Sequence, residues 1–137
     1  MSNDLPDWAI DDPAIAGEIR LLRRVPQARV HQGKCETSNF REDEEGRGLS
    51  VTVWEREADL DDVRRHHDGF GVICVAAHVF RSVGGIIVRV PLVGNLNHCE
   101  IFPRFTPSPQ KKLRAEVRWV YYPDWVGLEH RGPTEAF

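Results

Sequence analysis

The sequence predicts an α+β fold: a single compact domain with a four- or five-stranded, mostly antiparallel or mixed sheet and two or three helices. Its 137 residues suit one domain. Short β-branched runs are separated by turn residues, which is typical of strands. Regular alternation of strands with helices is missing, and so are the glycine-rich phosphate loops of nucleotide-binding folds. A doubly wound sheet is therefore not expected.

The densest apolar stretch, residues 70–92, is the expected core. Its first part fits both a strand and a helix. Residues 72–75 form a short apolar run that suits a buried strand, but apolar residues also recur at helical spacing from Val72 to Val83. We predict a strand over 71–75 that leads into a short helix ending near Ser82. A second strand is expected over 86–90, where Pro91 ends it.

Shorter elements are expected before this core. Residues 18–25 favour a strand, although Asp12-Pro13 is also a start signal for a helix over 13–24. Residues 49–54 alternate apolar with other side chains and predict a strand. Residues 59–67 run from acidic to basic, which is the charge order that a helix dipole prefers.

Two elements are expected after the core: a strand over 98–103 and a helix over 109–120. The apolar face of that helix would carry Leu113, Val117 and Val120. The α+β domain is therefore expected to span 13–123. A polar arm, residues 1–12, precedes it, and a tail, 124–137, follows it.

Composition limits the classes of function. Hydrophobic residues make up 41% and charged residues 28%, as in soluble globular proteins. No apolar run approaches the roughly 20 residues of a membrane span, and the acidic N-terminus does not read as a secretory signal. Three cysteines, Cys35, Cys74 and Cys99, favour reduced thiols in a cytoplasm. A net charge of −3 makes nucleic acid an unexpected partner, and no cofactor is predicted.

Cysteines and histidines suggest one possible metal set. Cys74 with His78, and the adjacent His98 and Cys99, would supply four ligands. Adjacent residues of a strand point to opposite faces, however, and no Cys-x-x-Cys motif is present. Buried thiols and ordinary histidines are the preferred interpretation, and no metal is predicted.

Arg23 (or Arg24), Ser38 and Glu100 follow the order in which an ADP-ribosyltransferase site uses these residue types. In such sites the arginine holds the phosphates of NAD, the serine orients the ribose and the glutamate stabilises the oxocarbenium-like centre. The order and the domain size resemble small bacterial transferase toxins. The Ser-Thr-Ser and Glu-x-Glu contexts are missing. The simpler interpretation is exposed arginines, a turn serine and a solvated glutamate.

His98 and Glu100 form a second candidate set, together with the His66-His67 pair. On a strand, residues two apart share a face, so His98 and Glu100 should project together. A histidine beside a carboxylate can do general acid–base chemistry. The simpler interpretation is an exposed pair that aids solubility.

Basic residues recur in three runs. These are Arg20, Arg23, Arg24 and Arg29; Arg64 and Arg65; and Lys111, Lys112, Arg114 and Arg118. They could merge into one patch that faces an acidic partner or RNA. Acidic runs interleave with them, so a mixed, solvated surface is the simpler interpretation.

Several short blocks resemble, in their order, a family of small bacterial proteins. They are Leu21-Leu-Arg-Arg-Val25, Thr37-Ser-Asn-Phe40, Leu49-Ser-Val51, Pro91 through Ile101, and Lys112-Leu113 through Val120. That family has an Arg-Arg strand, a Ser-x-Phe segment, a Leu-Ser-Val strand and a proline-containing segment that ends in His-Ala. Here Leu96 and Cys99 stand where proline and alanine are expected around His98. The resemblance implies one domain over most of residues 19–120, and no activity.

Together these features favour an accessory or regulatory component of a bacterial cytoplasmic system, acting through contact with a protein partner rather than as an enzyme. The positive indication is a group of aromatic residues outside the expected core, which would suit an interface: Trp8, Tyr121, Tyr122, Trp125 and Phe137. The alternative is a small ADP-ribosyltransferase-like enzyme that uses NAD.

Overall fold

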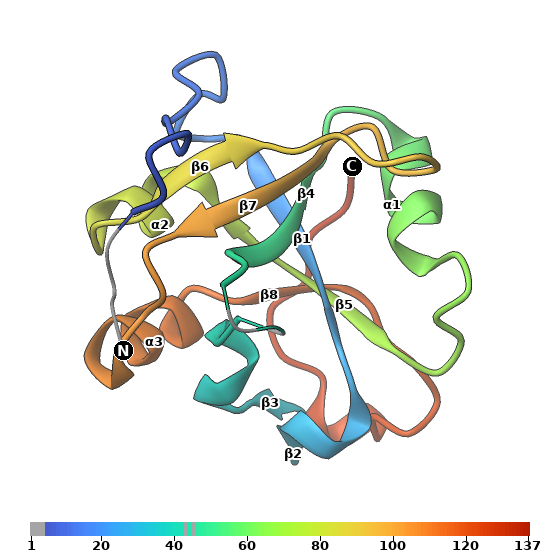
Figure 1. The fold of residues 1–137 in the computed structure, drawn as a ribbon. Coiled ribbons are helices and arrows are strands. Elements are labelled where there is room, and N and C mark those ends of the chain that lie inside the picture. The colour runs from blue at the N-terminus through green and yellow to red at the C-terminus, as the bar shows by residue number, and fades with distance from the viewer. Residues whose placement is uncertain (1–4, 43, 45) are drawn as a thin grey trace.

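A computed structural model describes residues 5–42, 44 and 46–137. Within these residues the chain forms three α-helices, a six-stranded antiparallel sheet and a two-stranded hairpin (Figure 1). The predicted α+β class is confirmed, and the main sheet has more strands than the four or five expected.

The main sheet holds six strands in an order that differs from their order in the chain. From one edge to the other they are β6 (Ile86–Arg89), β7 (His98–Phe102), β4 (Leu49–Val53), β1 (Arg20–Val25), β5 (Gly71–Ala76) and β8 (Arg118–Tyr121). The small hairpin is β2 (Val30–His31) with β3 (Lys34–Cys35). The α-helices are α1 (Glu57–Arg64), α2 (Ala77–Ser82) and α3 (Pro107–Ala115). The 3-10 turns are η1 (Gln27–Arg29), η2 (Thr37–Phe40) and η3 (Leu128–His130).

The central stretch folds as predicted, with β5 running directly into α2 and then β6. The switch from strand to helix has a local cause. The amides of Ala77 and His78 donate to the carbonyls of Ile19 and Gly17, at 2.8 and 2.9 Å. These carbonyls satisfy amides that have no partner within the first turn of α2. Residues 17 and 18 form a turn, in which the amide of Ile19 donates to the carbonyl of Ala16, and β1 follows from Arg20, so the alternative helix over 13–24 does not form.

The predicted helix over 109–120 is wrong in its second half. The helix ends at Ala115, and residues 118–121 form β8 at the edge of the sheet. Of the three residues expected on the apolar face, only Leu113 lies in the helix, where it is fully buried; Val117 and Val120 lie beyond its end. Arg118 to Tyr121 alternates aromatic and β-branched residues, which suits a strand, and this preference prevails where β5 offers a free edge.

Each face of the sheet packs against different helices. On one face, Ile73, Ile87 and Ile101 belong to the main core cluster, which also includes Phe80 of α2 and Leu113 of α3. We call this the α2/α3 face. On the other, the α1 face, Leu22, Val72 and Cys74 pack with Trp54 and with Val63 of α1. Figure 1 shows α1 to the right of the sheet and the other two helices to its left. Both faces are therefore covered over much of their area.

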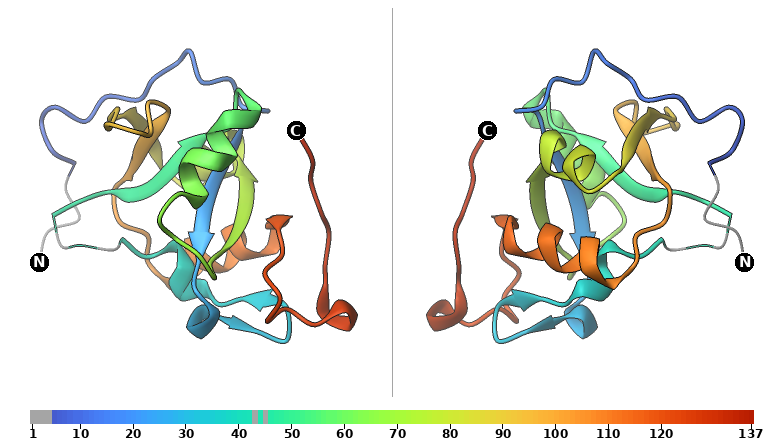
Figure 2. Two further views of the ribbon diagram at one scale, coloured as in Figure 1. Left: turned by 90° about the vertical axis from the view of Figure 1, so that its right-hand side faces the viewer. Right: turned by 90° about the vertical axis from the view of Figure 1, so that its left-hand side faces the viewer.

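Terminal segments cover the two edges of the sheet. At β6, the carboxylate of Asp11 accepts the amide of Ile87 at 2.9 Å, and the amide of Asp12 donates to the Ile87 carbonyl at 2.8 Å. At β8, the amide of Trp119 donates to Pro133, and the amide of Glu135 donates to Trp119, both at 2.8 Å. Figure 2 shows the C-terminal segment running extended along the outside of the fold. Backbone groups that would otherwise offer a template for association are thus paired.

All three cysteines are buried free thiols, and burial raises the pKa of each to about 12. A thiol with so high a pKa is a poor nucleophile near neutral pH. In the described part of the chain, no helix is both long and apolar enough to cross a membrane.

The aromatic residues near the ends are more buried than expected. Tyr121, Tyr122 and Trp125 are half-buried, and Tyr122 stacks on Trp119 with ring centroids 4.9 Å apart. Trp8 and Phe137 remain exposed, at 58% and 55%. Even these two contact other rings, those of Phe102 and Trp54. This group is consequently not a continuous exposed aromatic surface.

The side chain of Ile87 lies in the core and that of Ile86 is half-buried, so their truncation should have unequal effects. Ile87→Ala should lower the free energy of unfolding by about 2–4 kcal/mol, because it removes buried methyl groups and leaves a cavity. Ile86→Ala, the matched control, should cost less than half as much. Urea unfolding followed by tryptophan fluorescence measures both. Equal costs would contradict the register of β6.

Candidate functional site

The candidate site lies where β1 and β4 separate. The two strands pair only at Leu21 with Val53 and at Leu22 with Thr52. Beyond these pairs, the guanidinium of Arg23 donates to the carbonyl of Ser50 at 2.8 Å. A side chain thus replaces the ladder of backbone hydrogen bonds between the two strands, and an opening remains on the α1 face.

Arg23 holds several parts of the chain at this separation. Its guanidinium also donates to the carbonyls of Asn39 and Arg41, in and after η2. Arg23 is 6% exposed and pairs in the sheet with Ile73, so its side chain extends on the α2/α3 face. A buried guanidinium needs such acceptors, because an unsatisfied charged group in the interior is very costly. Arg23 is therefore a structural bridge under the opening.

Above this bridge, the opening is a cleft of about 810 Å³. Its floor comes from β1, β4 and β7, and its walls come from the end of α1 and from residues 90–97, which we call the β6–β7 loop. Its charged and imidazole-bearing lining residues are Arg23, Arg24, Arg29, Asp62, Arg65, His66, His67 and His98. Within the described residues, Asp62 is thus the one acidic lining residue, beside four arginines and three histidines. In a chain of net charge −3, this is a strong local excess of positive charge.

His67 lies among these positive charges and is partly buried. Burial lowers the pKa of His67 below its usual value, and the positive charges of Arg24 and His66 lower it further. A group whose charged form is disfavoured by cationic neighbours lies in a region of positive potential. An anion in the cleft would relieve that repulsion.

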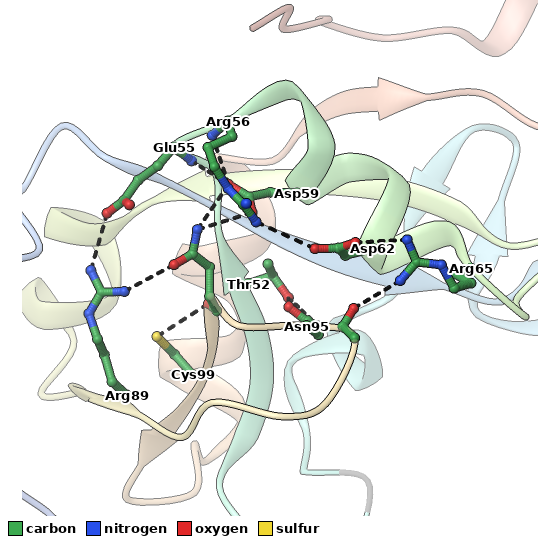
Figure 3. Close-up of polar contacts among 11 residues, drawn as sticks. Thr52, Glu55, Arg56, Asp59, Asp62, Arg65, Arg89, Asn95 and Cys99 are labelled. Carbon is green, nitrogen blue, oxygen red and sulfur yellow. Dashed lines mark hydrogen bonds and ion pairs between the residues drawn. The ribbon is translucent and has the colours of Figure 1, made fainter.

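One wall of the cleft, α1, is fastened by a buried carboxylate. Asp59 is 0% exposed and accepts the amides of Glu55 and Arg56, at 3.0 and 2.7 Å. It also accepts the guanidinium of Arg56 at 2.7 Å and the amide group of Asn97 at 3.0 Å. Because Asn97 directly precedes β7, Asp59 ties the start of α1 to the β6–β7 loop (Figure 3).

Burial alone would raise the pKa of Asp59. The hydrogen bonds from Arg56 and Asn97 and from the amide of Glu55 outweigh that effect and hold its pKa below the usual value. Asp59 is therefore a charged, structurally occupied carboxylate.

Arg65 spans the other end of the same wall. Its guanidinium donates to the carbonyl of Gly94 in the β6–β7 loop and to the carboxylate of Asp62, both at 3.0 Å. Figure 3 shows a chain of polar contacts that runs from Arg89 by way of Asp59 and Asp62 to Arg65. Arg65 is an exposed side chain, so its outer surface faces solvent at the mouth of the cleft.

On the floor of the cleft, a serine hydroxyl contacts an imidazole. The Oγ of Ser50 lies 2.6 Å from Nε2 of His98, across the boundary between β4 and β7. The other ring nitrogen, Nδ1, lies 2.8 Å from the carbonyl oxygen of Val90. Ser50 is half-buried and lines the cleft, whereas His98 is 4% exposed.

Glu100 shares a face of β7 with His98 but is occupied elsewhere. Its carboxylate accepts the amide of Gly48 at 2.9 Å and two guanidinium nitrogens of Arg47, at 2.7 and 3.2 Å. Burial alone would raise the pKa of Glu100, but Arg47, Gly48 and His98 together hold it below its usual value. A Cβ atom on Gly48 would lie 2.8 Å from the ring of Phe102, so only glycine permits this close approach.

The four residues predicted from the sequence do not all meet in one place. Arg23 and His98 line the cleft, while Ser38 and Glu100 do not. Ser38 is half-buried in η2, with its hydroxyl 3.4 Å from Glu36. The expectation that His98 and Glu100 form an exposed pair is wrong, because α1, the β6–β7 loop and residues 46–48 cover this face of the sheet. Both side chains are buried, at 4% and 3% exposure.

The sequence did not single out Ser50 as a site residue. From the sequence, Ser50 is only a polar position of a predicted strand. Its contact, His98, is 48 residues away in the chain, so no local pattern links the two. The basic runs were the available signal for the cleft. Arg24, Arg29 and Arg65 do converge there, whereas Lys111, Lys112 and Arg114 lie on α3, which packs on the other face.

Among the described residues, no group of three or more His, Cys, Asp and Glu side chains could hold a metal ion. Comparisons of the chain with protein-family models, with curated proteins and with solved structures find no match. The geometry of the cleft therefore carries the functional argument.

Asp59→Asn should lower the free energy of unfolding at pH 7 by about 2–4 kcal/mol, because it weakens charged hydrogen bonds to a buried group. The pKa of Asp59 is lowered by folding, so its contribution is complete above the ordinary carboxyl pKa and is lost as the pH falls through the folded-state pKa. The difference between variant and parent should therefore shrink at pH 3.

Urea unfolding at pH 7 and pH 3 tests this expectation. Asp61→Asn, at an exposed position of the same helix, is the matched control and should change stability by less than about 0.5 kcal/mol. A variant Asp59→Asn as stable as the parent at pH 7 would show that the network does not hold α1.

Proposed function

We propose that the protein binds a small anionic ligand, one that carries a carboxylate or phosphate group, in the cleft between α1 and the β6–β7 loop. The observation that carries this proposal is the lining: three arginines and two histidines lie beside Asp62, above the buried Arg23 and His98, in a chain whose net charge is negative. Arginine guanidinium groups match the planar, paired acceptors of these anions. A concave site with a few convergent polar groups is also the usual form of a small-molecule site.

The charge excess is local rather than a property of the whole surface. Ion pairs elsewhere balance many of the charges, as between Arg89 and Asp12 or Arg81 and Asp11. In the cleft, Asp62 pairs with Arg65, and among the described residues no second acidic side chain joins Arg24 and Arg29 in the lining. Walls of low dielectric constant strengthen the attraction of such a site for anions. We place the protein in the cytoplasm, in keeping with its buried, reduced thiols.

Reversing one charge at the mouth tests the proposal. Arg65→Glu should weaken the binding of inorganic phosphate and of citrate at least about tenfold, or 1.4 kcal/mol. The reason is Coulombic, since two unit charges about 5 Å apart at an effective dielectric constant of about 20 interact by about 3 kcal/mol. Isothermal titration calorimetry at two salt concentrations measures the change, and binding should weaken as salt rises.

The matched control for that variant is Arg114→Glu, which makes the same charge change at an exposed position of α3. It should bind both anions as the parent does. Equal binding by Arg65→Glu and the parent, or equal losses in both variants, would contradict an anion site in this cleft.

A second candidate function, contact with a protein partner, has its own supporting observation. The β6–β7 loop carries three exposed apolar side chains beside the basic cleft: Leu92, Val93 and Leu96, at 42%, 105% and 64% exposure. A partner segment that alternates acidic and apolar residues would place carboxylates in the cleft and apolar groups on the loop. An accessory role in a larger system would use such a surface. The NAD-transferase alternative needs Arg23, Ser38 and Glu100 in one site, so it gains less support from this arrangement.

A peptide that alternates glutamate and leucine is the probe for the second candidate. Val93→Ser should weaken its binding at least about fivefold, since burying a valine contributes roughly 1–2 kcal/mol. Leu128→Ser, at an apolar side chain 76% exposed in η3, should bind the peptide as the parent does. Fluorescence anisotropy of the labelled peptide measures both. If Val93→Ser binds as tightly as the parent, the loop is not a docking surface.

A further inference from the structure

Ser50 and His98 have the arrangement of a nucleophile and its base. Their 2.6 Å contact is within the range for a hydroxyl that donates to a neutral imidazole nitrogen. The serine lies at a solvent-accessible position on the floor of the cleft, and the histidine lies beneath it in the sheet. A substrate in the cleft would therefore meet the hydroxyl first.

The tautomer of His98 follows from its second contact. The carbonyl oxygen of Val90 can only accept a hydrogen bond, so Nδ1 of His98, 2.8 Å away, must carry the proton. In the neutral ring, Nε2 then has a free lone pair directed at the hydroxyl of Ser50. This is the protonation pattern that a base needs in order to take a proton from a serine.

A backbone carbonyl, rather than a carboxylate, orients the imidazole. Glu100 is on the same face of β7, but Arg47 and Gly48 occupy its carboxylate. The Val90 carbonyl is fixed by the β6–β7 pairing, because the amide of Val90 donates to the His98 carbonyl at 3.0 Å. On the other side, Arg23 holds the carbonyl of Ser50. A backbone carbonyl therefore holds the imidazole of His98, and the guanidinium of Arg23 holds the backbone of Ser50.

We propose that Ser50 and His98 form a nucleophile–base pair that hydrolyses an ester or thioester bearing an anionic group. The Oγ of Ser50 attacks the acyl carbon, and its proton passes to Nε2 of His98. His98 then gives this proton to the leaving alkoxide or thiolate. Water next attacks the acyl carbon and gives a proton to Nε2 of His98. The bond between the acyl carbon and Oγ then breaks, His98 returns the proton to Oγ, and the acid is released.

The cationic lining serves this step in two ways. It favours the negative charge that develops on the carbonyl oxygen during attack, as preorganised positive groups do in acyl transfer. It also selects substrates with a carboxylate or phosphate, and this part of the inference rests on the proposed anion binding. The reactivity of Ser50 itself does not depend on it.

Labelling with fluorophosphonates tests the pair, since these reagents phosphonylate activated serines and release fluoride. The full chain is incubated with a neutral alkyl fluorophosphonate, and adducts are located by intact mass and peptide mapping. Ser50 should be labelled, and Ser50→Ala should lose the adduct. Ser38→Ala removes a half-buried serine whose hydroxyl contacts the carboxylate of Glu36, so this control variant should label at the parental rate. His98→Gln should slow labelling at least about 100-fold.

A second reagent with a terminal carboxylate separates the two parts of the inference. It should label the parent at least about tenfold faster than the neutral reagent at equal concentration. Labelling of Ser50 at equal rates by both would contradict the anionic substrate class and leave the pair standing. No adduct at Ser50 with either reagent, in a protein whose melting temperature matches that of untreated chain, would overturn the pair even if anions bind. So would an adduct that persists in Ser50→Ala.

Discussion

The structure around the cleft depends on the buried guanidinium of Arg23. Two adjacent strands, β1 and β4, stop pairing after two residue pairs, and strands that diverge leave backbone groups without partners. Arg23 donates to one such carbonyl, that of Ser50 in β4, and also to the carbonyls of Asn39 and Arg41 in and after η2. An arginine suits this position because its donors are spread over a planar fork. Without that bridge, the opening between the strands would have to close or to admit water.

Two buried carboxylates then fix what surrounds the opening. Asp59 ties the start of α1 to Asn97 at the base of the β6–β7 loop, and Glu100 holds the turn at Arg47 and Gly48. Both are charged, and both have their acceptor capacity used by several donors. His98 lies between Asn97 and Glu100 in the chain, so the two anchors set its position from either side. The imidazole is left with the Val90 carbonyl and the Ser50 hydroxyl as partners.

The spacing of apolar residues and the position of turn residues were sufficient to predict most of the fold. The central strand–helix–strand stretch, β1, β4 and β7 all follow from alternation or from β-branched runs close to where they were predicted. The last helix was extended too far because Leu113, Val117 and Val120 fit a helical face, and only the open edge of β5 decides against it. Such an edge is a property of the assembled sheet and is not visible in a local window.

The site was less predictable for a related reason. The sequence predicts that His98 and Glu100 lie on the solvent-facing side of a strand. Both faces of this sheet are covered, however, so these polar side chains are buried and have hydrogen-bond partners in the protein. Which groups satisfy them depends on the register of β4 against β7, which pairs Ser50 with Glu100 and Thr52 with His98. No local pattern encodes that register. The convergence of Arg24, Arg29 and Arg65 likewise needs the tertiary fold.

The imidazole of His98 reports most directly on whether this cleft is a functional site. Long-range nitrogen–proton NMR spectra of the ¹⁵N-labelled protein, recorded during a phosphate titration, resolve its two ring nitrogens and identify the tautomer. We predict a proton on Nδ1 in the free protein, and an Nε2 resonance that moves as phosphate binds while the resonances of His78, on α2, stay fixed. A ring protonated at Nε2 alone, or a His98 whose resonances do not respond to phosphate, would contradict it.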